Sequence, residues 1–325
     1  MTQHATQTSG SKQAACVLGA TGFIGGHIAR AAVARGWHVR AVRRRPNATG
    51  AIADLPLDWI EADLGDASSL ARAMHGCSLV FHAAARYPRG IWNVARAVAD
   101  AEAEVQRVIA AARAAGVQRL IYTSSLSTMM QRCTPNMPPL NETSAYVPGT
   151  ARSAYFEAKW AMEQRVLAAR DLQPVALLPT AVFGPGDVKP TTGRVLLAAA
   201  RGRMPFYFEA ILNVVDVRDV AEAHLVAATQ APSGARLALG GHNLSLRALL
   251  ETVDRVQGMR RRRLRLPRRF ALAVLQAAVM LPDTVRLAAF WCPVDASQAR
   301  GLLGFAPRPF EETVRDALRW FGAVA

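Results

Sequence analysis

The feature that most constrains the fold is the alternation of short apolar runs with helix-like stretches over the first 180 residues. Each apolar run is followed, after a short connection, by a stretch with helical periodicity. Parallel strands need such crossover helices to return to the same edge of a sheet, so we predict an α/β fold with a doubly wound parallel sheet. The expected strands are residues 14–18, 37–42, 59–62, 79–83, 119–123 and 175–178, and the expected helices are 24–35, 68–74, 97–115 and 153–170.

Three glycines connect the first expected strand to the first expected helix in the sequence Gly-Ala-Thr-Gly-Phe-Ile-Gly. Gly19 permits a tight turn, Gly22 lets the backbone approach a pyrophosphate, and Gly25 lets the helix pack against the strand. Free amides at the helix start attract the anion. The position of these glycines indicates a Rossmann-type dinucleotide site, in which we include Phe23 and Ile24.

The ends of the next strands bear on which dinucleotide is bound. An acidic residue after the second strand would bind the ribose 2′-hydroxyl of NAD, but the chain has Arg43-Arg44-Arg45 there. We expect Arg43 to bind the 2′-phosphate of NADP(H), with an ordinary basic turn as the alternative. Asp63 and Leu64 are expected to hold the adenine. Small residues that would let the backbone approach the cofactor ribose, or would simply be packing alanines, are Ala83, Ala84 and Ala85.

Tyr155 and Lys159 are four residues apart on an expected helix and therefore point from the same face. A phenol titrates near pH 10, so a nearby ammonium is needed for it to exchange protons near neutrality. We predict that Tyr155 is the general acid/base and that Lys159 lowers its pKa and holds the nicotinamide ribose. Ser125, after the fifth strand, is expected to orient the reacting oxygen, with Ser124 as the substitute.

Beyond residue 180 the pattern loosens into loops, one further strand and helix, and terminal helices. We assign residues 14–180 and 212–236 to the dinucleotide-binding domain. A smaller, mostly helical substrate lobe is expected from residues 181–211 and 237–325, and residues 1–13 are expected to be a disordered leader. With 325 residues, 51% of them hydrophobic, the chain can bury a large core.

Cysteine usage and hydropathy narrow the cellular setting. The four cysteines lie far apart and form no C-x-x-C pair, so we expect neither a metal site nor a disulfide framework. No apolar run approaches the length of about 20 residues that a spanning helix needs. We therefore expect a soluble, cytoplasmic protein.

The net charge of +15 is partly local, because seven arginines lie within residues 260–269, and partly general, because the rest of the chain still carries +8 (15 − 7). One interpretation is a solvated arginine face. The other is a weak contact of residues 260–281 with anionic lipid, which would put the protein at the inner face of a membrane. Nucleic acid is not expected as a partner, since no helix-turn-helix, zinc-finger or RNA-binding pattern is present.

With these motifs in order, the chain resembles the extended short-chain dehydrogenase/reductase family of the NAD-dependent epimerase/dehydratase type. The resemblance covers residues 14–321 and rests on GATGFIG, ADL, FHAAA, YTSS, YFEAK and LLPTAVFGPGD. Within the family the chain is most similar to the hopanoid-associated sugar epimerase-like and dihydroflavonol-reductase-like groups.

The resemblance implies that Pro179 and Val182 border the nicotinamide. It also implies a homodimer formed through the helices at 97–115 and 153–170. One departure concerns residues 101–105, which read Ala-Glu-Ala-Glu-Val where relatives often carry Asn-Val-x-Gly-Thr. That difference puts the polar contacts of this helix with the cofactor in doubt.

Three functions are compatible with these residues. The first is an NADP(H)-dependent oxidoreductase that interconverts a secondary alcohol and a ketone, with NAD(H) as the other possible cofactor. The second is a nucleotide-sugar epimerase that retains NAD(P), and the third is a non-catalytic cofactor-sensing protein. The oxidoreductase is favoured by Arg43 and by a set of aromatic residues expected around a substrate pocket, namely Tyr87, Trp92, Phe206, Tyr207 and Phe208.

Overall fold

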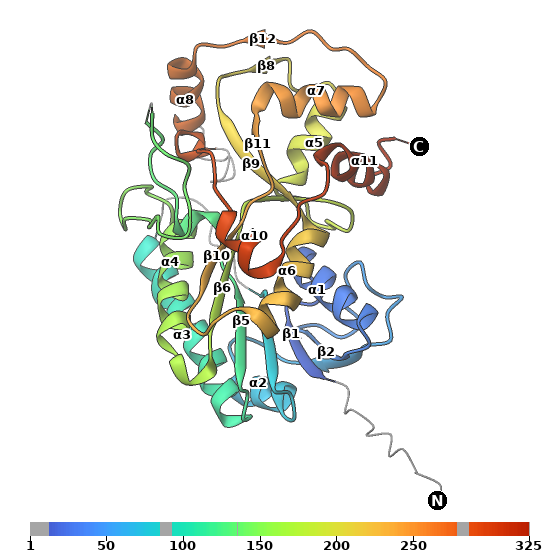
Figure 1. Ribbon diagram of the computed structural model, residues 1–325, viewed down its shortest axis with the longest axis vertical. Coiled ribbons are helices and arrows are strands. Elements are labelled where there is room, and N and C mark those ends of the chain that lie inside the picture. Colours follow the sequence, from blue (N-terminus) through green and yellow to red (C-terminus); the bar gives the residue numbers. More distant parts are fainter. Residues whose placement is uncertain (1–12, 85–92, 135, 278–285, 325) are drawn as a thin grey trace, which may run out of the picture.

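The computed structural model describes residues 13–84, 93–134, 136–277 and 286–324, and it has a seven-stranded parallel sheet at its centre (Figure 1). The strand order is β10-β6-β5-β4-β1-β2-β3, so the chain winds outward in both directions from β1. This order confirms the predicted Rossmann-type fold. The strands are β1 (Ala14–Leu18), β2 (His38–Arg43), β3 (Asp58–Glu61), β4 (Leu79–His82), β5 (Arg119–Thr123), β6 (Val175–Pro179) and β10 (Arg236–Leu239).

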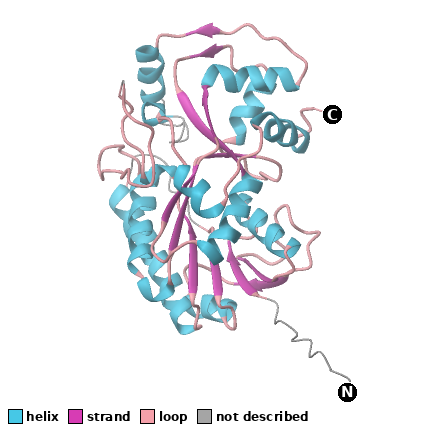
Figure 2. Ribbon diagram, viewed as in Figure 1, coloured by secondary structure: helices cyan, strands magenta, loops and turns pink. Residues whose placement is uncertain are grey.

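Helices cover both faces of this sheet (Figure 2). On one face lie α2 (Ala67–Met74), α3 (Val94–Ala114) and α4 (Ala154–Ala168), and on the other lie α1 (Phe23–Ala34), α6 (Val217–Gln230) and α10 (Ser297–Leu303). The expected helices of the first 180 residues are all present, with ends within three residues of the predicted ones.

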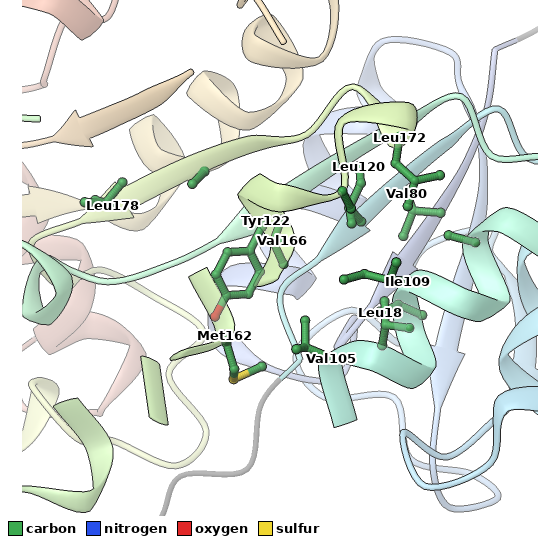
Figure 3. Packing of buried hydrophobic residues seen from close by; sticks show 14 of the residues in the cluster. Leu18, Val80, Val105, Ile109, Leu120, Tyr122, Met162, Val166, Leu172 and Leu178 are labelled. Carbon is green, nitrogen blue, oxygen red and sulfur yellow. The ribbon is translucent and has the colours of Figure 1, made fainter. Parts of the chain in front are cut away.

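The two faces of the sheet belong to two separate apolar clusters, because successive side chains of a strand point in opposite directions. In β1, Cys16 and Leu18 pack toward α3 and α4, whereas Ala15 and Val17 pack toward α1. Figure 3 shows the first cluster, where Leu18 lies among side chains of α3 and of neighbouring strands. Strands that are apolar on both faces are typical of a buried parallel sheet.

The remaining segments form an upper lobe around a third apolar cluster. Its three-stranded sheet has the order β11-β9-β7, and β8 pairs with β12. We assigned residues 212–236 to the dinucleotide-binding domain; in the structure the strand near residue 212, β9, pairs with β7 and β11, and the seventh strand of the main sheet is β10. The elements are β7 (Ala181–Phe183), α5 (Gly193–Ala200), β8 (Phe206–Tyr207), β9 (Ile211–Asp216), β11 (His242–Ser245), α7 (Leu246–Val256), β12 (Leu264–Arg265), α8 (Arg268–Ala277) and α11 (Phe310–Trp320).

Three short 3-10 helices complete the described elements: η1 (Leu126–Thr128), η2 (Arg170–Leu172) and η3 (Ala288–Phe290). None of the helices in the described ranges is both long and apolar enough to cross a membrane. The expected leader at residues 1–13 lies almost wholly outside the described residues.

A buried ion pair joins α4 to β10. The guanidinium of Arg236 donates to the carboxylate of Glu163 at 2.7 Å, and the Glu163 side chain is fully buried. Arg236 also donates to the carbonyl oxygens of Thr128 and Ser144, at 2.8 and 2.7 Å. The Glu163 carboxylate accepts a short hydrogen bond from the hydroxyl of Ser124. This pair therefore connects the edge of the sheet to the loop after β5.

One of our two interpretations assumed that the whole arginine-rich segment faces water. In the structure only part of the segment does so. Arg261 and Arg263 turn inward and form ion pairs with the buried carboxylate of Asp254 in α7. The other arginines of residues 260–269 surround β12 and the start of α8. The end of the segment we considered for lipid contact, residues 278–281, lies outside the described residues.

Candidate active site

The glycine turn between β1 and α1 brings the backbone close to the next strand and leaves no room for side chains. Gly19 has a φ of +86°, and a Cβ atom there would lie 2.8 Å from the backbone nitrogen of Ala84. A Cβ atom on Gly25 would lie 2.2 Å from the carbonyl oxygen of Gly19. Gly22 is the N-cap of α1 and has no capping side chain, and the first turn contains no acidic residue. The amides at the start of α1 are therefore available to an anion.

A cavity of about 1710 Å³ lies against this turn, at the carboxyl ends of the parallel strands. Ligand pockets usually measure roughly 300–1,000 Å³, so this cavity has room for a dinucleotide and a second molecule. Ligands bind at this edge in open α/β sheets. The predicted site residues that line it are Gly19, Gly22, Phe23, Ile24, Gly25, Asp63, Leu64, Ala83, Ala84, Ser125, Tyr155, Lys159, Pro179 and Val182. Ala85 lies outside the described residues.

Arg43 differs from the expectation, because its side chain is engaged within the sheet. It is the last residue of β2, stands opposite Glu61 of β3, and donates to the Glu61 carboxylate at 3.3 Å. Its guanidinium lies 5.7 Å from the centre of the Trp59 ring. Arg44 and Arg45 follow the strand and line the cavity instead. We had expected the strand to end at residue 42, but β2 includes Arg43, so Arg44 is the first residue beyond the strand.

The hydroxyl groups of Tyr155 and Ser125 meet in the lining of the cavity. Ser153 caps α4 by accepting a hydrogen bond from the amide of Phe156, which starts the helix just before Tyr155. The Tyr155 hydroxyl donates to the Ser125 hydroxyl at 3.0 Å. Ser125 is itself fixed, because its oxygen accepts from the amide of Ser127 at 3.1 Å. Ser124, the expected substitute, instead donates to Glu163.

Lys159 lies one helical turn below Tyr155 and is buried. Its ammonium donates to the carbonyl oxygen of Thr123 at 3.1 Å and to the hydroxyl of Tyr122 at 3.5 Å. Burial lowers the pKa of Lys159 to about 8, although the carboxylate of Glu163 opposes that change. The ammonium therefore remains charged near neutrality and loses its proton in mildly alkaline solution.

His82 is a buried polar group that our sequence analysis missed. It ends β4, its ring centre lies 5.4 Å from that of Tyr122, and neither ring nitrogen has a hydrogen-bond partner among the residues that the structure describes. Burial, with the nearby charge of Lys159, lowers the pKa of His82 to about 3. The imidazole is therefore neutral. The motif FHAAA contained the signal, but we had considered only its alanines.

The upper lobe gives the far part of the cavity an apolar lining. Phe206, Tyr207 and Phe208 line it as expected, whereas Tyr87 and Trp92 lie outside the described residues. The ring of Phe208 stacks on that of Trp291, with 6.1 Å between their centres. Apolar lining residues that we did not anticipate are Met130, Phe183, Leu249, Phe270, Val274 and Trp291.

A charged loop between β7 and α5 also reaches the cavity. Lys189 and Arg194 line it, together with Asp187. Burial raises the pKa of Asp187 to about 6, although the backbone amides of Thr191 and Lys189 partly offset the rise. These residues were not among the predicted site residues. These residues are far along the chain from the glycine turn, and their local sequence does not indicate that they line the cavity.

Comparison with known proteins adds to this geometry. A family model described as the NAD dependent epimerase/dehydratase family matches residues 15–240. A putative dihydroflavonol 4-reductase of Synechocystis is 32% identical over 94% of this chain and 93% of its own length. Sterol demethylase protein B of Methylococcus capsulatus is 28% identical over 94% and 97%. The crystal structure of a nucleoside-diphosphate-sugar epimerase from Pseudomonas aeruginosa superposes with a TM-score of 0.82, at 27% identity, over 97% of this chain and all of the other.

Proposed function

Because the chain belongs to the NAD dependent epimerase/dehydratase family, we propose that it is an NADP(H)-dependent oxidoreductase that interconverts a secondary alcohol and a ketone. Membership confirms the predicted resemblance to extended short-chain dehydrogenases, whose members are NAD(P)-dependent enzymes. The observation that carries the proposal is the contact of the Tyr155 and Ser125 hydroxyls above a buried lysine, inside the large cavity.

The residues at the glycine turn fit a nicotinamide dinucleotide. The space beside Gly19 and Gly25 admits only backbone, and the free amides at the start of α1 would bind the pyrophosphate. Arg44 would bind the 2′-phosphate of NADP(H) in place of Arg43. The nearest carboxylate in the neighbouring strand, Glu61, is paired with Arg43 and is thus partly neutralised.

Three side chains would carry the proton chemistry. A nicotinamide held at this site would supply or accept the hydride. Tyr155 donates its hydroxyl proton to the substrate oxygen during reduction and removes it during oxidation. Ser125, which already accepts from Tyr155, would donate to the same oxygen and orient it. Lys159 stabilises the phenolate of Tyr155 by its positive charge, so that the phenol exchanges protons near neutrality.

The lining of the upper lobe supports a bulky, apolar substrate. The stacked pair Phe208 and Trp291, with Phe183 and Met130, offers ring and alkyl surface and few polar groups. Such a wall would hold a ring system or an alkyl chain while only the oxygen meets Tyr155. The similarity to a sterol demethylase protein supports a substrate of lipid character.

A second candidate is a nucleotide-sugar epimerase that retains its cofactor. Lys189 and Arg194 would offer charges to a substrate diphosphate, and the similar crystal structure is of a nucleoside-diphosphate-sugar epimerase. In that reaction the same carbon is oxidised and then reduced, so no net NADPH is consumed. Net turnover of the cofactor separates the two candidates.

The test uses the purified protein and its copurifying nucleotide. Nucleotide released by denaturation is identified, and NADPH and NADH are titrated by nicotinamide fluorescence. NADPH oxidation is then followed with a series of apolar ketones. The oxidoreductase predicts tighter binding of NADPH and its net consumption by at least one ketone. A retained NAD with no net consumption, together with epimerisation of a nucleotide sugar, would instead establish the second candidate.

Two further expectations are part of this proposal. We propose a homodimer formed through α3 and α4, which lie side by side along one flank of the molecule (Figure 1). Light scattering coupled to size exclusion would give its mass directly. We also propose that the enzyme works in the cytoplasm.

A further inference from the structure

Four large apolar side chains are exposed together on β8, β12 and α8. The exposed fractions are 47% for Phe206, 68% for Leu264, 59% for Phe270 and 52% for Val274. The pairing of β12 with β8 places Leu264 opposite Phe206. Phe270 and Val274 are four residues apart in α8 and thus share one face of the helix. We call these four residues the apolar rim.

The apolar rim is also the mouth of the cavity. Phe206, Phe270 and Val274 line the cavity and are at the same time about half exposed. Deeper inside, the lining continues with Leu266 and Leu275 toward the apolar wall of the upper lobe. A molecule entering from this side would therefore stay in contact with apolar side chains along its path.

Positive charge surrounds the apolar rim. Arg260, Arg262 and Arg269 are exposed, and none of them forms an ion pair within the part of the chain that the structure describes. Arg265 is also exposed and pairs with Glu209 at 3.2 Å. Arg261 and Arg263 are held by Asp254, so the charge most available to a partner is that of the exposed arginines.

We propose that the apolar rim and the exposed Arg260, Arg262 and Arg269 dock on an anionic lipid bilayer, so that the cavity takes its substrate directly from the membrane. This inference rests on the proposed function, because it names the source of an apolar substrate for that site. Apolar side chains enter the acyl boundary while arginines remain at the phosphate level, as in membrane-surface helices. The rim lies at the end of the molecule opposite α2, so docking leaves the nucleotide-binding sheet in water (Figure 1).

The charge distribution favours lipid over a second copy of the chain. In a two-fold dimer the same patch meets itself, so Arg260, Arg262 and Arg269 would face their own copies. Among the described residues 201–211 and 255–277, Glu209 beside Arg265 is the only acidic residue. An anionic surface offers opposite charge at every point and covers the apolar rim as well.

The first test is cosedimentation with phosphatidylglycerol vesicles and with phosphatidylcholine vesicles, at low and at high salt. The variant changes Arg260, Arg262 and Arg269 to Gln and leaves the pairs with Asp254 intact. The matched control removes the same charge elsewhere, at Arg72, Arg170 and Arg300, which are exposed and do not line the cavity. Each arginine near the surface should contribute about a fivefold increase in affinity, so the first variant should bind anionic vesicles roughly 100-fold more weakly than the parent. The control variant should bind them far more tightly than the first variant.

The second test asks whether the apolar rim enters the acyl region. Leu264 is exposed and does not line the cavity, so Leu264→Trp adds a fluorophore without altering the site. Phospholipids brominated on the acyl chain should quench the added fluorescence of Leu264→Trp. They should leave that of Leu302→Trp, a partly exposed leucine on α10, unchanged.

The outcomes separate this inference from the proposed function. Equal binding to neutral and anionic vesicles, equal loss in both arginine variants, or pelleting without vesicles would overturn membrane docking. Absent quenching of Leu264→Trp would overturn insertion of the rim. Titration of NADPH by fluorescence, which needs no lipid, should be the same in all variants. Failure of NADPH to bind would count against the proposed function and leave the vesicle results standing.

Discussion

The Tyr155 hydroxyl donates a 3.0 Å hydrogen bond to the Ser125 hydroxyl, although the two residues are thirty positions apart. One side chain comes from the first turn of α4 and the other from the end of β5. A substrate oxygen placed beside both would receive two hydrogen bonds in the plane of its lone pairs. The contact therefore marks where the reacting oxygen should lie.

Tyr155→Phe keeps the ring and removes only the hydroxyl. We expect turnover to fall by about 10²–10⁴-fold, the usual contribution of general acid–base catalysis. Affinity for NADPH should change little, because the variant keeps Lys159 and the glycine turn. Steady-state kinetics and cofactor titration check both statements. Turnover within tenfold of the parent would rule out Tyr155 as the proton donor.

Arg44→Gln should reduce the preference for NADPH over NADH by roughly tenfold or more, because it removes a charged hydrogen bond worth about 1.5–3 kcal/mol. The matched control is Arg43→Gln, whose guanidinium is paired with Glu61 and does not line the cavity. That control should keep most of the preference. Fluorescence titration with both cofactors measures the ratio. A larger effect at Arg43 than at Arg44 would restore our original assignment.

Lys159 should make kcat/KM for ketone reduction fall at alkaline pH. Its pKa is lowered to about 8 by burial, so the ammonium charge is lost as pH rises through that value. The phenol of Tyr155 then becomes a weaker acid, and kcat/KM for ketone reduction should fall about tenfold per pH unit above that value. A flat profile of kcat/KM between pH 7 and 10 would contradict this role.

The same lysine should cost stability. Its folded pKa lies below the unfolded value of 10.5, so the unfolded chain binds more protons between pH 8 and 10.5, and stability should rise with pH in that window. At pH 7 the shift corresponds to about 3 kcal/mol. Lys159→Met should therefore raise the melting temperature by several degrees while abolishing turnover. A lower melting temperature would show that the hydrogen bonds of Lys159 outweigh its burial.

Arg236→Met should lower the free energy of unfolding by about 3–5 kcal/mol, because it leaves the Glu163 carboxylate buried without its partner. Arg113→Met is the control, since its pair with Asp171 is about half exposed on both sides and should contribute less than about 1 kcal/mol. Denaturation in urea compares the two. Similar losses would mean that the buried pair has no special role.

The sequence was sufficient for the six strands β1–β6 of the main sheet and for placing Tyr155 and Lys159 on one helix face. Strand and helix periodicity is local, and the spacing of Tyr155 and Lys159 is fixed by one helix turn. The position of Ser125 followed from the rule that the carboxyl ends of parallel strands meet at one edge. Each of these inferences needed only short-range pattern and a general rule of topology.

Other features depended on pairing between distant segments. The inward turn of Arg263 requires Asp254 of α7, and the engagement of Arg43 requires Glu61 of the neighbouring strand. Likewise, the apolar pattern of β9 does not indicate that this strand pairs with β7 and β11. The direction of a single side chain in these places depends on which distant segments lie beside it, and local periodicity does not specify that.

The path of the chain between the lobes limits how such an enzyme can acquire a new substrate. After β6 the chain builds β7 and β9 in the upper lobe, returns to the main sheet with α6 and β10, and then leaves again for β11 and α7. The upper lobe is thus built from two stretches of chain, one before and one after β10, and cannot be exchanged whole at a single point. Recombination at one point would exchange only one of the two stretches, so replacement of the whole lobe would need two crossover points.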